Sequence, residues 1–262
     1  MKQSFFGSRT RALFGNTAAP SKPSREGIVL CYPAVYEYNQ SHWAFKKLQL
    51  SLARAGLHVL RFDYYGVGDS AGDLEDGTLA GWEGDIRTAL EELAESSQCR
   101  SLSLVGMGLG ASLAVRVARK AQLKTLVLWN PVLSGNRYID DLFARDEDEN
   151  LHLLHGNRGT DRDEAMGYPF TRALRLALTS LDLMREPLPK TKRVQIFCSQ
   201  PSPLAEQYAQ RLKQGGVDAA YEVVQEEGAT NEGAAEAANL STRVLAAITE
   251  TLTPQQAQKA AS

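Results

Sequence analysis

Short apolar runs alternate along the chain with longer stretches whose apolar residues recur at helical spacing. Runs without an internal polar break are typical of parallel strands that are buried on both faces. We predict such strands at 27–33, 58–63, 101–107, 125–129, 194–198 and 221–224. Helical patterns lie between them, at 41–55, at 79–93, from 109 onward, at 203–213 and at 232–252. Because strands and helices alternate, we expect an α/β fold with a doubly wound, mostly parallel sheet.

The remaining segments complete the predicted organisation. Residues 1–26 carry two short apolar pieces and then a proline-containing stretch, which predicts an edge hairpin followed by a linker. The sheet and its helices are expected to occupy 27–131 and 192–252, and 253–262 is expected to be a flexible tail. Residues 132–191 are longer than an ordinary connection and show no strand pattern. We therefore expect a small helical cap over the edge of the sheet where open α/β sheets bind ligands.

The predicted cap contains an acidic run, Asp146-Glu-Asp-Glu149, and then a helical stretch at 170–183. A run of like charges is most often a solvated face, so we expect these side chains to face water. Docking of a partner protein is the alternative.

The strand at 101–107 passes directly into a helical pattern through Gly106-Met107-Gly108-Leu109-Gly110. A strand, a tight turn and a helix in this order form the nucleophile elbow, which is normally written G-x-S-x-G. Gly106 and Gly110 occupy the two glycine positions, and Gly108 stands where the serine belongs. Glycine adopts positive φ without strain, so Gly108 keeps the turn while removing the hydroxyl.

Several segments together resemble the α/β-hydrolase superfamily, and within it the serine-aminopeptidase-like branch that includes exosortase-associated hydrolases. The resemblance extends from about residue 27 to the C-terminus, and it implies the α/β-hydrolase fold. The segments that carry it are Cys31-Tyr-Pro33 with Ser41-His42 downstream, Arg61-Phe-Asp-Tyr-Tyr-Gly-Val-Gly-Asp-Ser70, Leu128-Trp-Asn-Pro131 and Gly167-Tyr-Pro-Phe-Thr-Arg-Ala-Leu174.

The chemistry of this family needs a serine at the elbow, an Asp or Glu after a late strand and a His after the last strand. In this chain the elbow residue is Gly108, and no carboxylate follows the strand at 194–198 before Glu206. No histidine follows the last strand, because all four histidines precede it: His42, His58, His152 and His155. Loss of the nucleophile alone costs about a million-fold in rate in subtilisin. The sequence therefore predicts a member of the family that lacks the Ser-His-Asp triad.

A binding pocket can survive without the triad. The resemblance implies an oxyanion hole made by the backbone N–H groups of Leu109 and of the loop at 33–35, which can hold a carbonyl oxygen. The alternative is that Met107 and side chains of the cap fill the space. The expected ligand-binding residues are Pro33, Ala34, Val35, Tyr36, His42, Met107, Gly108 and Leu109. No catalytic residue is assigned, and His42 remains as a candidate general base, with a surface or capping histidine as the alternative.

Other candidate groups have structural explanations. Asp63 ends a strand before a glycine turn, where Asp commonly accepts local backbone N–H groups, and it is not expected to pair with Asp69. Ser70 and Ser112 have no recognisable base nearby in the sequence, and Cys31 is expected to be a buried, inert thiol. Among the histidines, His58 is expected in the core or at an edge, and His152 and His155 in solvent.

Composition narrows the function classes further. The net charge of −2 comes from 29 basic and 31 acidic residues, so neither nucleic acid nor a membrane surface is an expected partner. The three cysteines are far apart and predict no metal site and no disulfide framework. The glycine patterns do not match the dinucleotide fingerprint, so we expect no cofactor. With no secretory signal in the sequence, a cytoplasmic location is expected.

Three functional hypotheses follow. The first is a non-hydrolytic protein that binds a small acyl or other organic ligand, or a biosynthetic partner, under the cap; the resemblance alone suggests an acyl carrier. The second is an enzyme that uses the oxyanion-type pocket with His42 or Tyr36 for a lyase, isomerase or cyclisation step. The third is an esterase or thioesterase with relocated catalytic residues. The oligomeric state is left open.

Overall fold

The computed structural model describes residues 1–33, 36–150, 164–225 and 242–253. Its strands are β1 Lys2–Ser8, β2 Arg11–Ala18, β3 Glu26–Cys31, β4 His58–Phe62, β5 Ser101–Met107, β6 Leu123–Trp129, β7 Glu164–Ala165, β8 Tyr168–Pro169, β9 Thr191–Cys198 and β10 Asp218–Val223. Its helices are α1 Tyr36–Arg54, α2 Leu79–Ser97, α3 Leu109–Val117, α4 Gly135–Asn150, α5 Arg172–Thr179, α6 Pro203–Gln214 and α7 Thr242–Leu252, with a short 3-10 helix η1 Leu74–Asp76.

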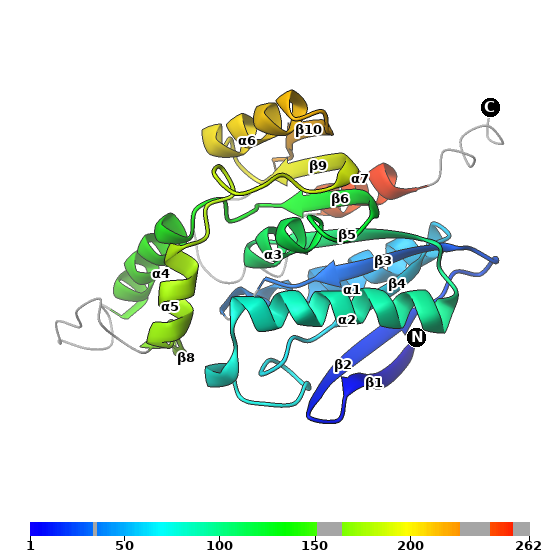
Figure 1. The fold of residues 1–262 in the computed structure, drawn as a ribbon, viewed down its shortest axis with the longest axis horizontal. Coiled ribbons are helices and arrows are strands. Elements are labelled where there is room, and N and C mark those ends of the chain that lie inside the picture. Colours follow the sequence, from blue (N-terminus) through cyan, green and yellow to red (C-terminus); the bar gives the residue numbers. More distant parts are fainter. Residues whose placement is uncertain (34–35, 151–163, 226–241, 254–262) are drawn as a thin grey trace.

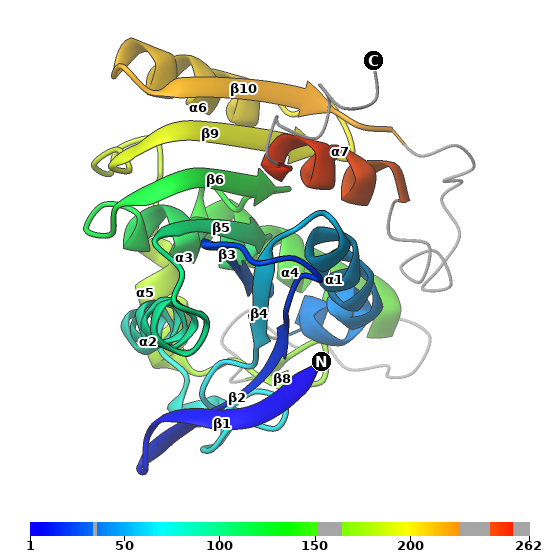
Figure 2. The same cartoon turned by 90° about the vertical axis from the view of Figure 1, so that its right-hand side faces the viewer.

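An eight-stranded sheet in the order β1-β2-β4-β3-β5-β6-β9-β10 forms the centre of the molecule (Figure 1). From β4 to β10 in this order, all neighbouring strands run parallel. β2 runs antiparallel to β4, and β1 antiparallel to β2, as the predicted edge hairpin requires. Helices α1 and α7 cover one face, and α2, α3 and α6 cover the other (Figure 2). The predicted α/β class with a mostly parallel sheet is therefore confirmed.

Local sequence signals set most helix ends. The Thr78 side chain accepts a hydrogen bond from the Gly81 N–H at 3.1 Å and caps α2, which begins where the helical pattern at 79–93 was predicted to begin. Gly56 follows α1 with a φ of 99°, which glycine adopts without strain. The start of α1 differs from the prediction of 41, because the helix already begins at Tyr36. Its first turn is aromatic and polar, so periodicity could not identify it.

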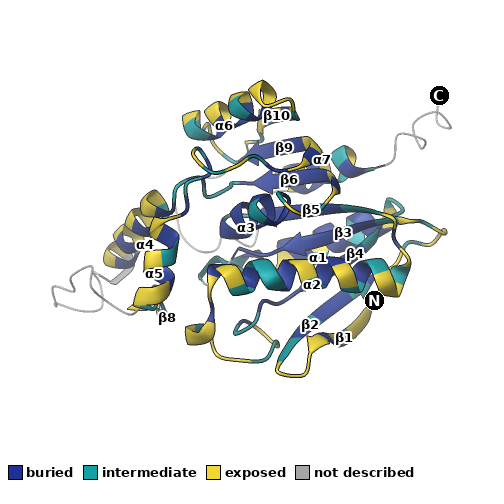
Figure 3. Ribbon diagram, viewed as in Figure 1, coloured by how far each residue is buried: buried dark blue, intermediate teal, exposed yellow. Residues whose placement is uncertain are grey.

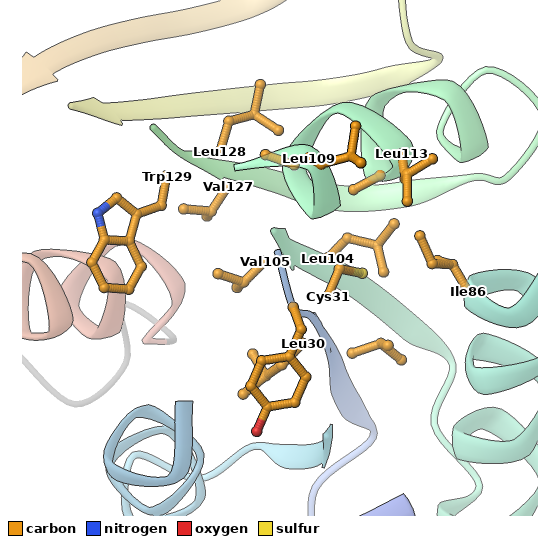
Figure 4. Packing of buried hydrophobic residues seen from close by; sticks show 14 of the residues in the cluster. Leu30, Cys31, Ile86, Leu104, Val105, Leu109, Leu113, Val127, Leu128 and Trp129 are labelled. Carbon is orange, nitrogen blue, oxygen red and sulfur yellow. The ribbon is translucent and has the colours of Figure 1, made fainter. Parts of the chain in front are cut away.

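The hydrophobic core lies on both sides of the sheet (Figure 3). Strand residues such as Leu30, Val105 and Val127 are fully buried beneath the helices. Leu109 and Leu113 of α3 belong to the same cluster, together with Ile86 of α2 (Figure 4). Because the first turn of α3 is part of this core, the junction between β5 and α3 is held rigidly. Among the described helices, none is both long and apolar enough to cross a membrane.

Residues 132–191, the inserted segment, contribute helices α4 and α5, which lie beyond the carboxyl ends of the parallel strands (Figure 1). The two ends of this segment pair with each other, since the Leu183 N–H donates to the Leu133 carbonyl at 2.9 Å. The prediction of no strand here was wrong, because β7 and β8 form a short hairpin. Its turn places Met166 and Gly167 at positive φ, the geometry of a type I′ turn.

The acidic run also departs from the prediction. Asp146 is buried, with 3% of its surface exposed, and accepts a hydrogen bond from the Met166 N–H at 2.9 Å. The carboxylate thus serves the hairpin turn instead of facing water. Glu147 and Asp148 are exposed, as predicted. A partner-docking role for this run stays a prediction.

Candidate functional site

The junction of β5 and α3 has the geometry of a nucleophile elbow. Gly108 lies between them with φ 55° and ψ −125°, a conformation that is strained for any residue with a side chain. Its N–H donates to the Trp129 carbonyl at 2.9 Å, and its own carbonyl accepts from the Val132 N–H at 3.2 Å. The turn is therefore fixed by the last residue of β6 and by the chain that follows it.

The three glycines of the elbow are needed for different reasons. A Cβ atom on Gly110 would lie 2.0 Å from the Tyr32 carbonyl oxygen, and one on Gly106 would lie 2.6 Å from the Gly110 carbonyl oxygen. These two glycines allow α3 to pack directly against the ends of β3 and β5. A Cβ atom on Gly108 would meet only Pro33 Cβ within 4 Å, at 3.3 Å. Among the described residues, Pro33 is therefore the one close neighbour that would have to give way, by a few tenths of an ångström, to a side chain at the position of the nucleophile.

A cavity of about 570 Å³ lies between the elbow and α4. This is within the usual size range of small-molecule sites, about 300–1,000 Å³. Its apolar lining residues are Pro33, Met107, Pro131, Val132, Leu133, Pro201, Pro203 and Leu204. The remaining lining residues are Glu37, Gln40, Ser41, Gly108, Asn130, Ser134, Arg137, Tyr138, Asp141, Arg145 and Ser202. The cavity can thus receive a ligand that has both an apolar and a polar part.

The structure brings together only part of the predicted binding set. Pro33, Met107 and Gly108 line the cavity, and an open space remains beside Met107. The cavity lining does not include Tyr36, His42 or Leu109. Leu109 is the first residue of α3, so its backbone N–H has no acceptor within the helix. Ala34 and Val35 lie outside the described residues. A binding role for these five residues stays a prediction.

His42 is engaged in a cluster on the other side of α1. Its Nε2 lies 3.2 Å from Nη1 of the buried Arg61, which also donates to the Tyr32 hydroxyl at 2.7 Å. Arginine can only donate, so Nε2 must accept and the imidazole carries its proton on Nδ1. Burial lowers the pKa of His42, and the positive charge of Arg61 lowers it further. The lone pair that a general base would use is therefore already hydrogen-bonded.

The ends of two strands beside the elbow carry a neutral pair. Asn130, directly after β6, donates from Nδ2 to the Ser199 hydroxyl at 3.0 Å. Ser199, directly after β9, donates its N–H to Asn130 Oδ1 at 2.8 Å. The position after a late strand, where the family places its acid, is thus occupied by uncharged groups that satisfy each other. Residues 226–241, which follow β10, lie outside the described residues, and their sequence contains no histidine.

Alternative nucleophiles are engaged in structural bonds. The Ser70 hydroxyl donates to the Asp63 carbonyl at 2.6 Å and accepts from the Phe14 N–H at 2.8 Å. The Ser112 hydroxyl is buried and donates to the Val132 carbonyl. As predicted, Asp63 accepts a local backbone N–H, that of Asp69, at 3.1 Å. These groups stabilise the loops around β4 and the elbow.

The thiols are buried and protonated. Burial raises the pKa of Cys99 and Cys198 to about 11 and raises that of Cys31 further. Within the described ranges, no group of three His, Cys, Asp or Glu residues could hold a metal ion. His58 is half-buried at the start of β4, whereas the elbow follows the end of the parallel strand β5, so His58 lies at the opposite end of the strands from the elbow. His152 and His155 lie outside the described residues.

Sequence reasoning missed the polar wall of the cavity. The Tyr138 hydroxyl of α4 donates to Glu37 Oε2 of α1 at 3.1 Å, and Arg145 lies close enough to act on the charge of Glu37. Burial raises the pKa of Glu37, outweighing its own backbone N–H, the Tyr138 hydroxyl and the positive charge of Arg145. A spacing of four between Arg137, Asp141 and Arg145 was the available signal, but α4 itself was not recognised.

Known proteins resemble this chain in sequence and in fold. A family model described as "Alpha/beta hydrolase family" matches residues 34–250. The mitochondrial palmitoyl-protein thioesterase ABHD10 of Bos taurus is 39% identical over 73 residues, which are 28% of this chain and 22% of that protein. The Homo sapiens protein of the same name is 38% identical over 73 residues. The match therefore spans about a fifth of the length of these relatives.

Solved structures match nearly the whole chain at low sequence identity. Est1E from Butyrivibrio proteoclasticus with bound ferulic acid has a TM-score of 0.67 and 16% identity, covering 99% of this chain and 100% of that chain. Alpha/beta hydrolase domain-containing protein 10 from mouse has a TM-score of 0.61 and 19% identity, covering 96% and 98%. At these identities the likeness shows a shared fold.

Proposed function

This chain belongs to the alpha/beta hydrolase family, and we propose that it is a non-hydrolytic member that binds a small acyl or other organic molecule in the cavity between the elbow and α4. The observation that supports this most strongly is Gly108, which has the backbone conformation of the nucleophile, faces open space and carries no side chain. Acyl transfer needs an attacking group and a base to activate it. Among the described cavity residues there is neither a histidine nor a cysteine.

The mechanism is then binding without turnover. The apolar residues of the cavity receive the hydrocarbon part of the ligand, and the N–H groups at the start of α3 can hold a carbonyl oxygen. Hydrolysis does not follow, because residue 108 of the elbow carries no hydroxyl and the imidazole of His42 is bonded to Arg61. An acyl carrier or another biosynthetic protein that delivers the ligand, and a cytoplasmic location, remain predictions. The word "mitochondrial" in the names of the relatives applies to those proteins.

Restoring the serine tests this proposal. We expect Gly108→Ser to give no more hydrolysis of p-nitrophenyl esters or acyl thioesters than Gly108→Ala, because the base and the acid are also missing. Both variants should fold, since only Pro33 among the described residues must give way slightly at this position, at a cost of about 1–3 kcal/mol for the positive φ. Initial rates against a buffer blank measure the outcome, and circular dichroism confirms folding. Hydrolysis by the serine variant alone would show that the fold supplies a base after all.

A thioesterase-type hydrolase with relocated catalytic residues is the second candidate. It is favoured by the similarity of this chain, over 73 residues, to the palmitoyl-protein thioesterases named above. It requires an activated nucleophile other than residue 108. Covalent labelling of the wild-type chain with a fluorophosphonate probe detects such a nucleophile. The third candidate, a lyase, isomerase or cyclisation enzyme, loses support because Tyr36 and His42 do not line the cavity.

A further inference from the structure

The polar wall of the cavity comes from two helices. Glu37 of α1 is half-buried and faces Tyr138 and Arg145 of α4. Arg137 and Asp141 of α4 complete the charged groups of the lining. The other walls are formed by the elbow, by 130–134 and by 201–204, and they contribute no titratable side chain to the described lining. All charge that a ligand meets is therefore concentrated at one side.

The arginines on this wall have unused hydrogen-bond donors. Within the described residues, neither Arg137 nor Arg145 forms a salt bridge, and both side chains are exposed at the cavity. Each guanidinium has five N–H groups in a planar arrangement that matches a carboxylate. Two cationic groups thus stand against one exposed carboxylate, Asp141, and the half-buried Glu37.

The protonation state of Glu37 decides whether the net charge of this wall is positive or zero. Its carboxyl group is desolvated, which favours the neutral form, and the Tyr138 hydroxyl already occupies Oε2. In the neutral form the carboxyl group becomes a hydrogen-bond donor. A donor at Glu37 together with the arginine N–H groups presents a wall of donors to the cavity, and this arrangement suits an anion. An ionised Glu37 would instead repel an anion.

We propose that the cavity binds an organic carboxylate, whose charged group is held by Arg145 and Arg137 and accepts a hydrogen bond from a neutral Glu37, so that binding takes up a proton at any pH where Glu37 is ionised in the free protein. This inference rests on the proposed function and names its ligand class. The proton comes from solvent and remains on Glu37, and no covalent bond forms or breaks. The hydrocarbon part lies against the apolar residues, such as Met107, Val132 and Leu204.

The proposal fixes the direction of the pH dependence. Binding of an anion beside Glu37 raises the pKa of its carboxyl group further, because two negative charges cannot share the site. The affinity for the carboxylate is therefore highest at pH values below the pKa of Glu37 in the free protein, where Glu37 is already protonated. It falls as the pH rises above that pKa. The limiting slope is about tenfold in Kd per pH unit for one proton. A neutral ligand of the same shape has no such dependence.

The test is isothermal titration calorimetry of the full chain with butyrate, hexanoate and octanoate and with the primary amides of the same acids. We expect at least one carboxylate to bind, with a Kd that rises with pH. Proton uptake should appear as a dependence of the measured heat on the ionisation enthalpy of the buffer.

Glu37→Gln, which keeps an acceptor for Tyr138 and always donates, should bind the carboxylate with a Kd that does not change with pH. Arg145→Met should weaken carboxylate binding about tenfold or more and leave amide binding unchanged. The matched controls are Glu95→Gln on α2 and Arg54→Met at the far end of α1, both exposed and outside the lining.

The outcomes separate the two levels of the proposal. Equal binding of amides and carboxylates, or a pH-independent Kd for the wild-type protein, would overturn the carboxylate inference and leave the organic-ligand function in place. Failure of both series to bind would overturn the proposed function itself. Because proton uptake is measured on the wild-type protein, the test stands even where a variant does not fold.

Discussion

Replacing Gly110 by alanine is expected to destabilise the protein by about 3 kcal/mol or more. The new Cβ atom would lie 2.0 Å from the Tyr32 carbonyl oxygen and 2.6 Å from that of Cys31, so α3 must move away from the end of β3. Backbone atoms cannot rotate aside as the end of a flexible side chain can. Thermal unfolding should show a fall in Tm of about 6–12 °C for a domain of this size.

Gly84→Ala is the matched control, because Gly84 is also a helical glycine. A Cβ atom there would meet only Arg87 Nη2, at 3.8 Å. Alanine in such a position usually stabilises a helix by about 0.4–1 kcal/mol through its effect on the unfolded chain. If the two substitutions gave similar changes in Tm, the close approach of α3 to β3 would not exist in the protein.

Asp85→Ala is expected to cost about 2–4 kcal/mol of unfolding free energy. Asp85 lies on α2 with 1% of its surface exposed, and accepts bonds from Arg11 Nε at 2.7 Å, Arg11 Nη2 at 3.0 Å and the Tyr65 N–H at 3.0 Å. Arg11 also lies over the Tyr65 ring, 4.2 Å from its centroid. One carboxylate therefore connects the N-terminal hairpin and the loop that follows β4 to α2. Its removal leaves the Tyr65 N–H without this acceptor.

Urea unfolding of Asp85→Ala, with Glu95→Ala on the same helix as the control, measures this cost. Glu95 is exposed, so its replacement should change the free energy of unfolding by less than about 0.5 kcal/mol. Arg11→Met should cost less than Asp85→Ala, because the Arg11 side chain is one-third exposed and its charge is screened by water. A loss at Asp85 no greater than at Glu95 would contradict the assigned role.

The predicted fold followed from patterns that act over short distances in the chain. The apolar run at 101–107 and the glycines after it identified the elbow, because only glycine allows the contacts seen at Gly106 and Gly110. The N-terminal hairpin and the start of α2 at Leu79 could be predicted for the same reason, since each depends on neighbouring residues.

The rest depends on contacts between distant segments. Glu37 and Tyr138 are 101 positions apart, and neither residue alone suggests a partner. In the sequence Asp146 belongs to an acidic run and resembles a solvated residue. In the structure it accepts a hydrogen bond from the Met166 N–H of the β7–β8 turn. His42 was a reasonable candidate for a base, but Arg61, 19 positions away, occupies its ring nitrogen. Burial and partner choice, which set these roles, are properties of the folded chain.

The central claim is that the elbow is kept as a binding framework while its acylating chemistry is absent. Treatment of the wild-type chain with a fluorophosphonate probe, followed by intact-protein mass spectrometry, tests this claim most directly. We predict no gain in mass under conditions that fully label an active serine esterase in the same sample. A stoichiometric adduct on any serine, with Ser41, Ser134 and Ser202 of the cavity as the first positions to map, would contradict it.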